Sequence, residues 1–144
     1  MTLHATAIAV DGRAALLFGA SGSGKSDLAL RCLIPVASLG GKAVTPELVA
    51  DDQVEIALEG GQIVCRPPPT IAGRIEVRGF GIVDVPHLPM ARVALAVVLD
   101  GLPAERMPGP AARQILGIDI PEIRLSPFEA SAPMKLLLAL HQAR

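Results

Sequence analysis

Gly19 to Ser26 reads GASGSGKS and matches the pattern G-x-x-x-x-G-K-[ST] at every fixed position. The stretch follows an apolar run that is typical of a strand and precedes a segment with helical spacing, which is the context of a phosphate-binding P-loop. Its glycines allow successive backbone N–H groups to point at phosphate oxygens, and the positive end of the following helix adds to the attraction. The residues predicted to bind the phosphates of ATP are Gly19, Ala20, Ser21, Gly22, Ser23, Gly24, Lys25 and Ser26.

Two side chains of this loop have expected roles in phosphate chemistry. Lys25 would reach the β- and γ-phosphates, and the hydroxyl of Ser26 would ligate Mg²⁺. Phosphoryl transfer is catalysed mostly by positioning and charge stabilisation, so the chain must also supply a metal-site carboxylate and a group that handles the proton of the nucleophile. The loop alone therefore predicts ATP and Mg²⁺ as cofactors, and a phosphotransferase is the class of protein that we expect.

The segments around the loop predict a strand, a loop and a helix in succession. Leu3 to Val10 and Ala14 to Phe18 are apolar runs separated by Asp11-Gly12, a strong turn signal, so we expect the chain to open as a β-hairpin. From Ser26 the residues DLALRCLI have helical spacing, and Pro35 followed by Gly40-Gly41 ends the expected helix.

The middle of the chain alternates apolar runs with turn signals. Glu47 to Ala50 is a short apolar segment, and the runs VEIALE and QIVCRP form an expected hairpin about Gly60-Gly61. A helical turn is expected over Thr70 to Arg74. Arg92 to Leu99 is a nearly continuous apolar run, which predicts a strand of the buried kind.

The last third of the chain begins with a segment rich in Pro and Gly. LPAERMPGP at 102–110 is therefore expected to be a mobile loop, and Ala111 to Leu116 a short helix. IPEIRLSP at 120–127 is expected to add a strand. Ser131 is expected to cap a C-terminal helix that has Pro133 near its start.

Length and composition fit one α/β domain over residues 1–144, because the hydrophobic fraction is 51% and no repeat or long linker divides the chain. The net charge is -1, no basic run is present, and there is no Trp or Tyr on which bases could stack, so neither nucleic acid nor a membrane is an expected partner. No window reaches the ~18 apolar residues of a membrane span, and we expect a cytoplasmic protein. Cys32 and Cys65 are expected to be buried, reduced thiols.

Two strand ends offer a carboxylate for the metal site. Asp100 follows the long apolar run, as the acidic residue of a Walker B strand does, although Asp100-Gly101 is also an ordinary turn. Asp51 and Asp52 follow LVA. Two adjacent carboxylates repel each other, so a nearby cation is needed to keep both ionised, and one of them is suited to proton transfer. A solvated acidic turn is the alternative for this pair.

Two nucleotide-binding classes are disfavoured. LEGGQ at 58–62 resembles the signature LSGGQ of transporter ATPases, but it lies between two strand-like runs, where a hairpin turn explains the glycines. The chain contains no asparagine, so the N-K-x-D element of guanine-specific proteins is absent and a conventional GTPase is disfavoured.

Three segments complete the pattern: Leu3-His4 ahead of the glycine-rich loop, LVADDQV at 48–54 and EVRGFGIVDV at 76–85. Together they resemble the catalytic domain of the bacterial HPr kinase/phosphorylase family. That family has a short His-containing strand before the P-loop, an A-D-D segment after the P-loop helix, and an E-x-R-G-h-G-h-h-[DN]-V segment, in which h is hydrophobic. The resemblance covers about residues 3–100 and is weaker onward.

The resemblance implies a P-loop kinase fold related to phosphoenolpyruvate carboxykinase, with a mixed sheet and β-hairpins. It implies transfer of the ATP γ-phosphoryl group to a serine of HPr, the phosphocarrier protein, which many members reverse with inorganic phosphate. By position, Asp51 would act as base toward the serine and as acid in reverse, and Asp52 would support the metal. His4 would lie near the phosphates, Glu76 would help to hold Mg²⁺, and Arg106, in a stretch similar to a family D-R-h-G loop, would touch transferred phosphate.

Simpler roles are open for several of these residues. His4 could be only a strand residue, and Glu76 and Arg78 could form a surface ion pair. Gly79 and Gly81 could serve only a tight turn, although alternate glycines also suit the close approach of a backbone or a ligand.

The chain also departs from the family pattern. We expect a form without the N-terminal domain of full-length members, in which FEASAP at 128–133 stands in place of a late G-R-N segment and the C-terminal helix that helps many members to hold HPr is shortened or absent. We therefore expect a minimal form of the enzyme, and a homo-oligomer. Two rival functions share the same loop: a small-molecule kinase, for which 102–110 is a short lid, and a nucleotide-binding regulatory module without turnover.

Overall fold

A β-hairpin lies near the start of the chain, with its turn at the predicted Asp11-Gly12 dipeptide. Both turn residues have left-handed φ angles, 54° at Asp11 and 75° at Gly12, and such a turn matches the right-handed twist of the strands that it joins. The strands are β2 (Thr6–Val10) and β3 (Arg13–Phe18), which are antiparallel. The computed structural model describes residues 1–34, 37–39, 42–103 and 105–143 of the chain.

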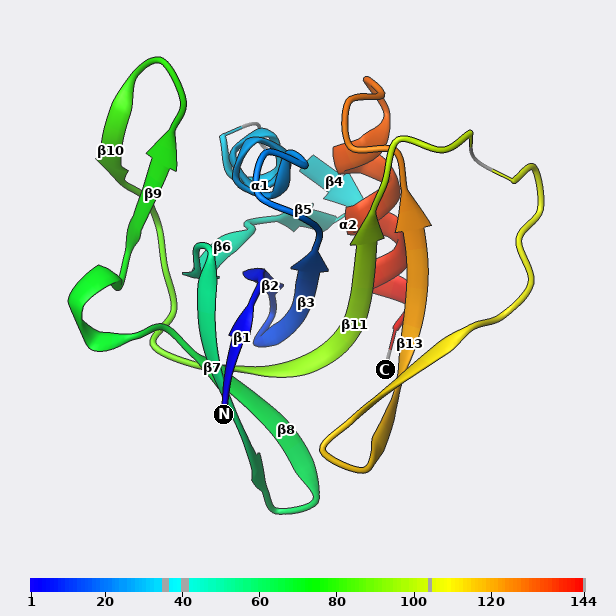
Figure 1. Cartoon of the computed structure of the whole chain (residues 1–144), viewed down its shortest axis with the longest axis horizontal. Helices are drawn as coiled ribbons and strands as arrows, with labels where there is room; N and C mark the ends of the chain where they lie inside the picture. Colours follow the sequence, from blue (N-terminus) through cyan, green and yellow to red (C-terminus); the bar gives the residue numbers. More distant parts are fainter. Residues whose placement is uncertain (35–36, 40–41, 104, 144) are drawn as a thin grey trace.

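Within these described residues, nine strands form one curled, mixed sheet, and two further pairs of strands lie outside it (Figure 1). The order is β1-β7-β8-β11-β3-β2-β6, and β13 pairs with both β11 and β12. The strand bounds are β1 (Thr2–His4), β6 (Glu47–Ala50), β7 (Gln53–Glu59), β8 (Gln62–Arg66), β11 (Ala91–Leu99), β12 (Ala112–Ile115) and β13 (Ile118–Leu125), with β4 (Ala37–Leu39), β5 (Lys42–Val44), β9 (Arg74–Val77) and β10 (Gly81–Asp84) outside the sheet.

The expected first strand over Leu3 to Val10 is divided into two. β1 pairs with β7, whereas β2 pairs with β3 and β6. Ala5 lies between the two strands, and its N–H donates a 3.0 Å hydrogen bond to the carbonyl of Asp52. The strand divides because its two halves pair with different neighbours, and this change of partner brings the end of β1 to the acidic pair.

Three segments of the chain meet at one edge of the sheet. β3 and β13 both pair in parallel with β11, so the carboxyl ends of these three strands lie at the same edge. The glycine-rich loop follows β3, Asp100 follows β11, and Ser126 follows β13. In open α/β sheets, ligands bind outside the carboxyl ends of the strands.

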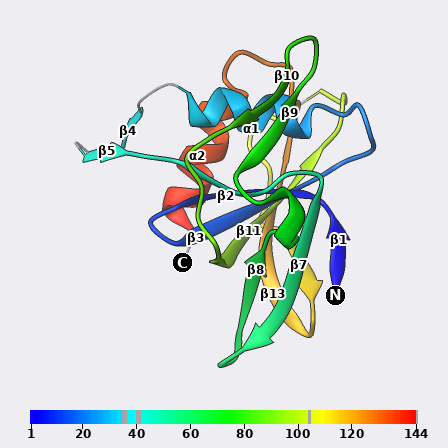
Figure 2. The same cartoon turned by 90° about the vertical axis from the view of Figure 1, so that its left-hand side faces the viewer.

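The two faces of the sheet bury different residues. In β2, Ile8 packs in one hydrophobic cluster, and its neighbours Ala7 and Ala9 pack in a second cluster on the opposite face. The alternation of side chains along a strand produces this division. Helices α1 (Lys25–Leu33) and α2 (Ala132–Gln142) contribute to the first cluster and lie next to each other over that face (Figure 2).

The prediction of a helix over Ala111 to Leu116 is wrong, because the segment contains strand β12. Leu116 and Gly117 have left-handed φ angles of 48° and 79° and form a turn into β13, with which β12 pairs antiparallel. A helix this short is disfavoured by the cost of its nucleus. Pairing with β13 satisfies the same backbone groups and buries Ile115.

The predicted helical ends are partly correct. In place of a helical turn over Thr70 to Arg74, a 3₁₀ turn spans Pro69–Ile71, and Arg74 already begins β9. Ser131 stands at the N-cap position of α2, but its side chain makes no capping hydrogen bond.

Neither of the helices in the described ranges has the length and apolar character needed to cross a membrane.

The segment EVRGFGIVDV forms a hairpin that projects from the body of the molecule beside α1 (Figure 1). Gly79 and Gly81 have φ angles of 80° and 134°, and a Cβ at either position would meet no atom within 4 Å. The two glycines therefore allow the turn between β9 and β10, and no other backbone segment packs closely against them. Gly60 and Gly61 form the predicted turn between β7 and β8 in the same way, with φ of 59° and 77°.

Both cysteines are free, buried thiols, as expected. Burial raises the pKa of Cys32 to about 12, against a smaller opposing effect of the Arg31 charge. Burial likewise raises the pKa of Cys65 to about 12. Neither thiol is therefore suited to nucleophilic or metal chemistry at neutral pH.

Candidate functional site

The glycine-rich loop turns tightly at the carboxyl end of β3. Gly22 and Gly24 have left-handed φ angles of 80° and 97°, which residues with a side chain rarely adopt. A Cβ at Gly19 would lie 2.3 Å from Ser23 Oγ, so a side chain there would displace the Ser23 hydroxyl. Within the described part of the chain, the buried Ser23 Oγ has no hydrogen-bond partner. The loop therefore contains an unused hydroxyl, which suits a cradle for a polar ligand.

Lys25 is only 5% exposed, although it carries a positive charge. Its Nζ donates hydrogen bonds of 2.9 Å to the carbonyl of Gly19 and 3.2 Å to that of Ala20. Among the ion pairs of the described residues, none includes Lys25. A buried ammonium group held only by neutral carbonyls has its charge uncompensated, and phosphate oxygens would compensate it.

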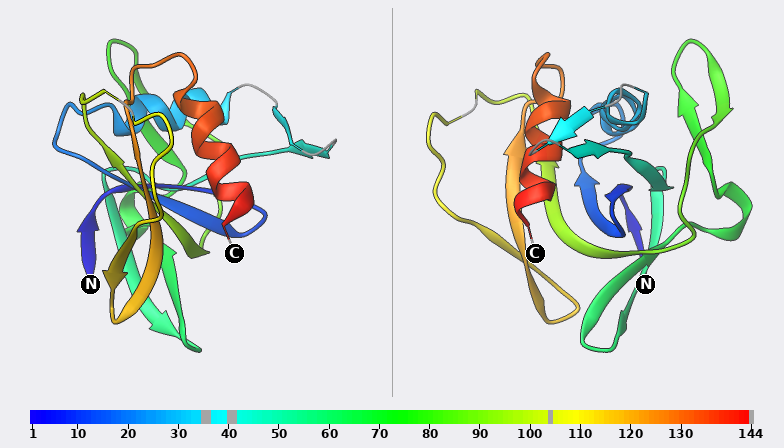
Figure 3. Two further views of the ribbon diagram at one scale, coloured as in Figure 1. Left: turned by 90° about the vertical axis from the view of Figure 1, so that its right-hand side faces the viewer. Right: turned by 180° about the vertical axis from the view of Figure 1, so that it is seen from behind.

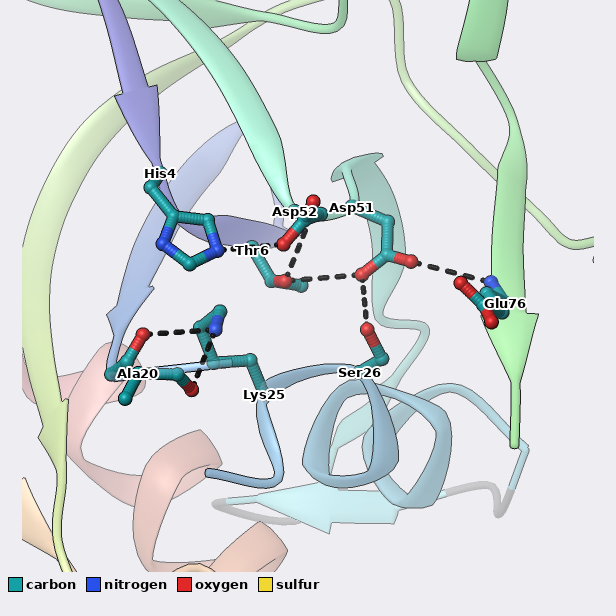
Figure 4. Close-up of polar contacts among 9 residues, drawn as sticks. His4, Thr6, Ala20, Lys25, Ser26, Asp51, Asp52 and Glu76 are labelled. Carbon is teal, nitrogen blue, oxygen red and sulfur yellow. Dashed lines mark hydrogen bonds and ion pairs between the residues drawn. The ribbon is translucent and has the colours of Figure 1, made fainter. Parts of the chain in front are cut away.

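Asp51 is the centre of the polar network in Figure 4. It is 7% exposed, and its Oδ1 accepts hydrogen bonds from the hydroxyls of Ser26 at 2.5 Å and Thr6 at 3.1 Å. Its Oδ2 accepts a 3.2 Å hydrogen bond from the backbone N–H of Glu76. Asp51 thus links the end of the glycine-rich loop to β2 and β9, and the turn between β6 and β7 is more than a solvated acidic turn.

Asp52 is held in a different way from its neighbour. Its backbone N–H donates a 3.2 Å hydrogen bond to Thr6 Oγ1, and its φ of 67° is left-handed. Its Oδ1 lies 2.8 Å from Nε2 of His4, and both of these side chains are about half exposed, at 61% and 48%. The buried Thr6 hydroxyl therefore connects the two carboxylic residues and points them in different directions, Asp51 toward Ser26 and Asp52 toward His4 (Figure 4).

A cleft of about 430 Å³ opens over these groups. The glycine-rich loop and the first turns of α1 form one wall, and Asp51 and Asp52 with residues Glu76–Arg78 form another. Phe128, from the turn after β13, also lines the cleft. Segments that are far apart in the chain thus meet at one concave site, as small-molecule sites generally require.

Two residues from the sequence analysis lie away from this cleft. Asp100, the alternative metal carboxylate, accepts a 2.8 Å hydrogen bond from Arg124 and a 3.1 Å hydrogen bond from the N–H of Leu102, which is the behaviour of a turn residue. Arg106 is exposed in the loop between β11 and β12 and does not line the cleft. Its contact with transferred phosphate stays a prediction.

The surface ion pair of Glu76 and Arg78, the simpler alternative for these residues, is not among the ion pairs of the described residues. Both residues line the cleft instead. One acidic and one basic residue thus contribute to the wall that they form with Asp51 and Asp52.

Sequence reasoning missed Thr6 and Phe128. Thr6 is fully buried in an otherwise apolar strand, and a hydroxyl at that position was the signal, because a buried hydroxyl requires a partner. Phe128 lies in the segment that departs from the family pattern, and no local pattern indicated that it would reach the loop.

The donor set fits Mg²⁺ together with a polyphosphate. Ser26 Oγ donates its proton to Asp51, so the lone pairs of its oxygen are free for a metal. In the described part of the chain, no group of three or more His, Cys, Asp or Glu side chains could hold a metal ion without other ligands. Mg²⁺ prefers hard oxygen ligands and is usually bound by one or two carboxylates together with substrate phosphates, which agrees with this site.

Comparisons with known proteins connect the site to one family. The family model described as HPr Serine kinase C-terminal domain matches residues 1–93. The HPr kinase/phosphorylase of Clostridium tetani is 39% identical over 98 residues, which are 68% of this chain and 28% of that protein. The enzyme of the same name from Clostridium beijerinckii is 40% identical over 86 residues, 60% of this chain and 26% of the relative. The chain thus spans about a quarter of the length of these curated relatives.

The fold similarity extends further than the family model. The solved structure of the HPr(Ser) kinase/phosphatase from Coxiella burnetii matches with a TM-score of 0.79 at 26% sequence identity. This match covers 99% of this chain and 96% of that chain. The mixed α/β architecture is therefore shared almost to the C-terminus, including β13 and α2.

Proposed function

Because the chain belongs to the family of HPr serine kinase C-terminal domains, we propose that it is an ATP- and Mg²⁺-dependent kinase that phosphorylates a serine of the phosphocarrier protein HPr. The fold is proposed to be that of the P-loop kinases related to phosphoenolpyruvate carboxykinase. We also propose that the protein acts in the cytoplasm as a homo-oligomer and reverses the transfer with inorganic phosphate.

One observation carries this proposal: a buried carboxylate, Asp51, lies between the hydroxyl of Ser26 and an open cleft. A carboxylate has about four acceptor positions, and the hydrogen bonds from Ser26, Thr6 and Glu76 take three of them. The remaining position is on Oδ2, which accepts only the N–H of Glu76 among the described donors. An incoming serine hydroxyl could donate to it.

Different residues would bind the phosphates, neutralise their charge and hold the metal ion. Gly19–Ser26 hold the phosphates, and Lys25 neutralises their charge. Ser26, Asp52 and Glu76 would hold Mg²⁺, which supplies further charge neutralisation at the β- and γ-phosphates. His4 fixes the orientation of Asp52 through its Nε2.

Asp51 is the proposed general base for the serine hydroxyl. It accepts the proton of the serine hydroxyl while the serine oxygen bonds to the γ-phosphorus and the bond from that phosphorus to the ADP oxygen breaks. In the reverse direction, Asp51 returns the proton to the serine oxygen while inorganic phosphate takes up the phosphoryl group, which gives pyrophosphate.

The test is a transfer assay with HPr from the same cell and ATP labelled at the γ-phosphate. We expect label on wild-type HPr and none on HPr in which the acceptor serine is replaced by alanine. The proposal is wrong if this chain leaves HPr unlabelled while a longer family member labels it in the same assay. In that event, label on a member of a metabolite panel would identify a small-molecule kinase, and tight ATP binding with no labelled acceptor would identify a regulatory module.

A further inference from the structure

Phe128 is 70% exposed, yet its ring lies against the glycine-rich loop. A Cβ built on Gly24 would lie 3.1 Å from Phe128 Cε1 and 3.2 Å from Cζ, so the ring edge touches the loop backbone next to Lys25. The ring also lines the cleft. A large apolar surface left in water is unfavourable, and its position at the mouth of a polar cleft suggests that it contacts a ligand.

The position of Phe128 is fixed from helix α1. The guanidinium of Arg31 donates hydrogen bonds to the carbonyls of Pro127 and Glu129, the two residues on either side of Phe128, and the bond to Glu129 measures 3.2 Å. Arg31 is held in turn by a 3.0 Å contact with Asp27, one turn earlier in the helix. The turn that carries the Phe128 ring is therefore held in place by its hydrogen bonds to Arg31.

The arrangement of the cleft indicates on which side of the glycine-rich loop the terminal phosphate and the nucleoside of a bound nucleotide would lie. The groups proposed for phosphoryl transfer, Asp51 and Glu76, lie on the side of hairpin β9–β10. Helix α1 lies between that hairpin and the turn after β13, as Figures 1 and 3 show from the front and from behind. When the terminal phosphate points toward Asp51, the nucleoside leaves the loop on the other side, where Phe128 lies.

We propose that Phe128 is the base platform of the nucleotide site, on which the adenine of ATP stacks. This inference rests on the proposed function, because it requires a nucleotide in the loop. Composition argued against any stacking platform, since the chain has no Trp or Tyr and only three Phe, but a single ring at the right place is sufficient. Stacking on an aromatic ring tolerates every base, so Phe128 provides affinity more than base selectivity.

The absence of Trp and Tyr allows a direct test. In Phe128→Trp, the new indole is the sole Trp of the chain, and we expect Mg-ATP to quench its fluorescence while inorganic tripolyphosphate does not. In Phe128→Ala, we expect affinity for Mg-ATP, measured by calorimetry, to fall by roughly 5- to 100-fold, with affinity for tripolyphosphate unchanged. Phe80 is the matched control, because it is 79% exposed and does not line the cleft; Phe80→Trp and Phe80→Ala should show neither effect.

The outcomes separate this inference from the proposed function. Equal loss of ATP and tripolyphosphate affinity in Phe128→Ala would mean that the ring only supports the loop, and unchanged ATP affinity would mean that it does not contact the base; either result overturns the inference alone. A wild-type protein that binds neither ATP nor tripolyphosphate would overturn the proposed function as well.

Discussion

Ser26 Oγ donates a 2.5 Å hydrogen bond to Asp51 Oδ1, although the two residues lie 25 positions apart in the chain. This contact joins the loop that is predicted to bind phosphate to the carboxylate that is proposed to accept a proton. It also turns the oxygen lone pairs of Ser26 away from Asp51.

Replacing Asp51 by Asn should remove phosphoryl transfer to HPr while ATP still binds. The amide cannot take up the serine proton, and loss of a general base typically lowers kcat by about 10²- to 10⁴-fold. The measurements are single-turnover transfer and the Kd for Mg-ATP. The matched change at the neighbouring residue, Asp52→Asn, should lower kcat less than Asp51→Asn does, because Asp52 is exposed and pairs with His4. If the two variants exchange these phenotypes, the proton-accepting role belongs to Asp52.

Thr6→Val should slow transfer without changing ATP affinity. Valine keeps the shape of threonine, but it removes the hydroxyl that donates to Asp51 and accepts from the Asp52 N–H. Loss of a hydrogen bond to a charged group is worth roughly 1.5–3 kcal/mol, so kcat should fall about 10- to 100-fold. Thr6→Ser restores a hydroxyl and should recover most of the rate. Equal defects in Thr6→Val and Thr6→Ser would instead indicate a packing role for the methyl group.

Asp100→Asn should leave both ATP affinity and transfer within about twofold of wild type, because Asp100 pairs with Arg124 outside the cleft. Its cost in stability should be small, roughly 0–1 kcal/mol, as for other ion pairs near the surface. Denaturant unfolding and the Mg-ATP Kd measure the two quantities. A large loss of metal-dependent ATP binding would instead identify Asp100 as the Walker B residue.

Neither cysteine should react with a disulfide reagent at pH 8 while the protein is folded. With pKa values of about 12, roughly one thiol in 10⁴ is ionised at that pH, and both side chains are buried. In the unfolded chain the thiol pKa returns to about 8.5, so both cysteines should react quickly in denaturant. Rapid labelling of one thiol in the native protein would contradict the burial described for it.

The hairpin turns and the long buried strand could be predicted from the sequence because their signals are local. Asp11-Gly12 and Gly60-Gly61 adopt the left-handed φ angles that such dipeptides favour. The apolar run over Arg92 to Leu99 is buried in the centre of the sheet as β11. The prediction failed at Ala111 to Leu116, where residues that tolerate a helix pair with β13 instead, because backbone pairing with a distant strand overrides a weak local preference.

The sequence by itself determined the loop that fits phosphate, because eight adjacent residues carry all the glycines, the lysine and the hydroxyl that such a loop needs. Only the tertiary structure decided which carboxylate serves it. Asp51 and Asp100 both follow strands, but the pairing of β2 with β6 brings Asp51 to Ser26, whereas Asp100 turns to Arg124. The same holds for Thr6 and Phe128, whose roles depend on contacts between segments far apart in the chain, which no local pattern encodes.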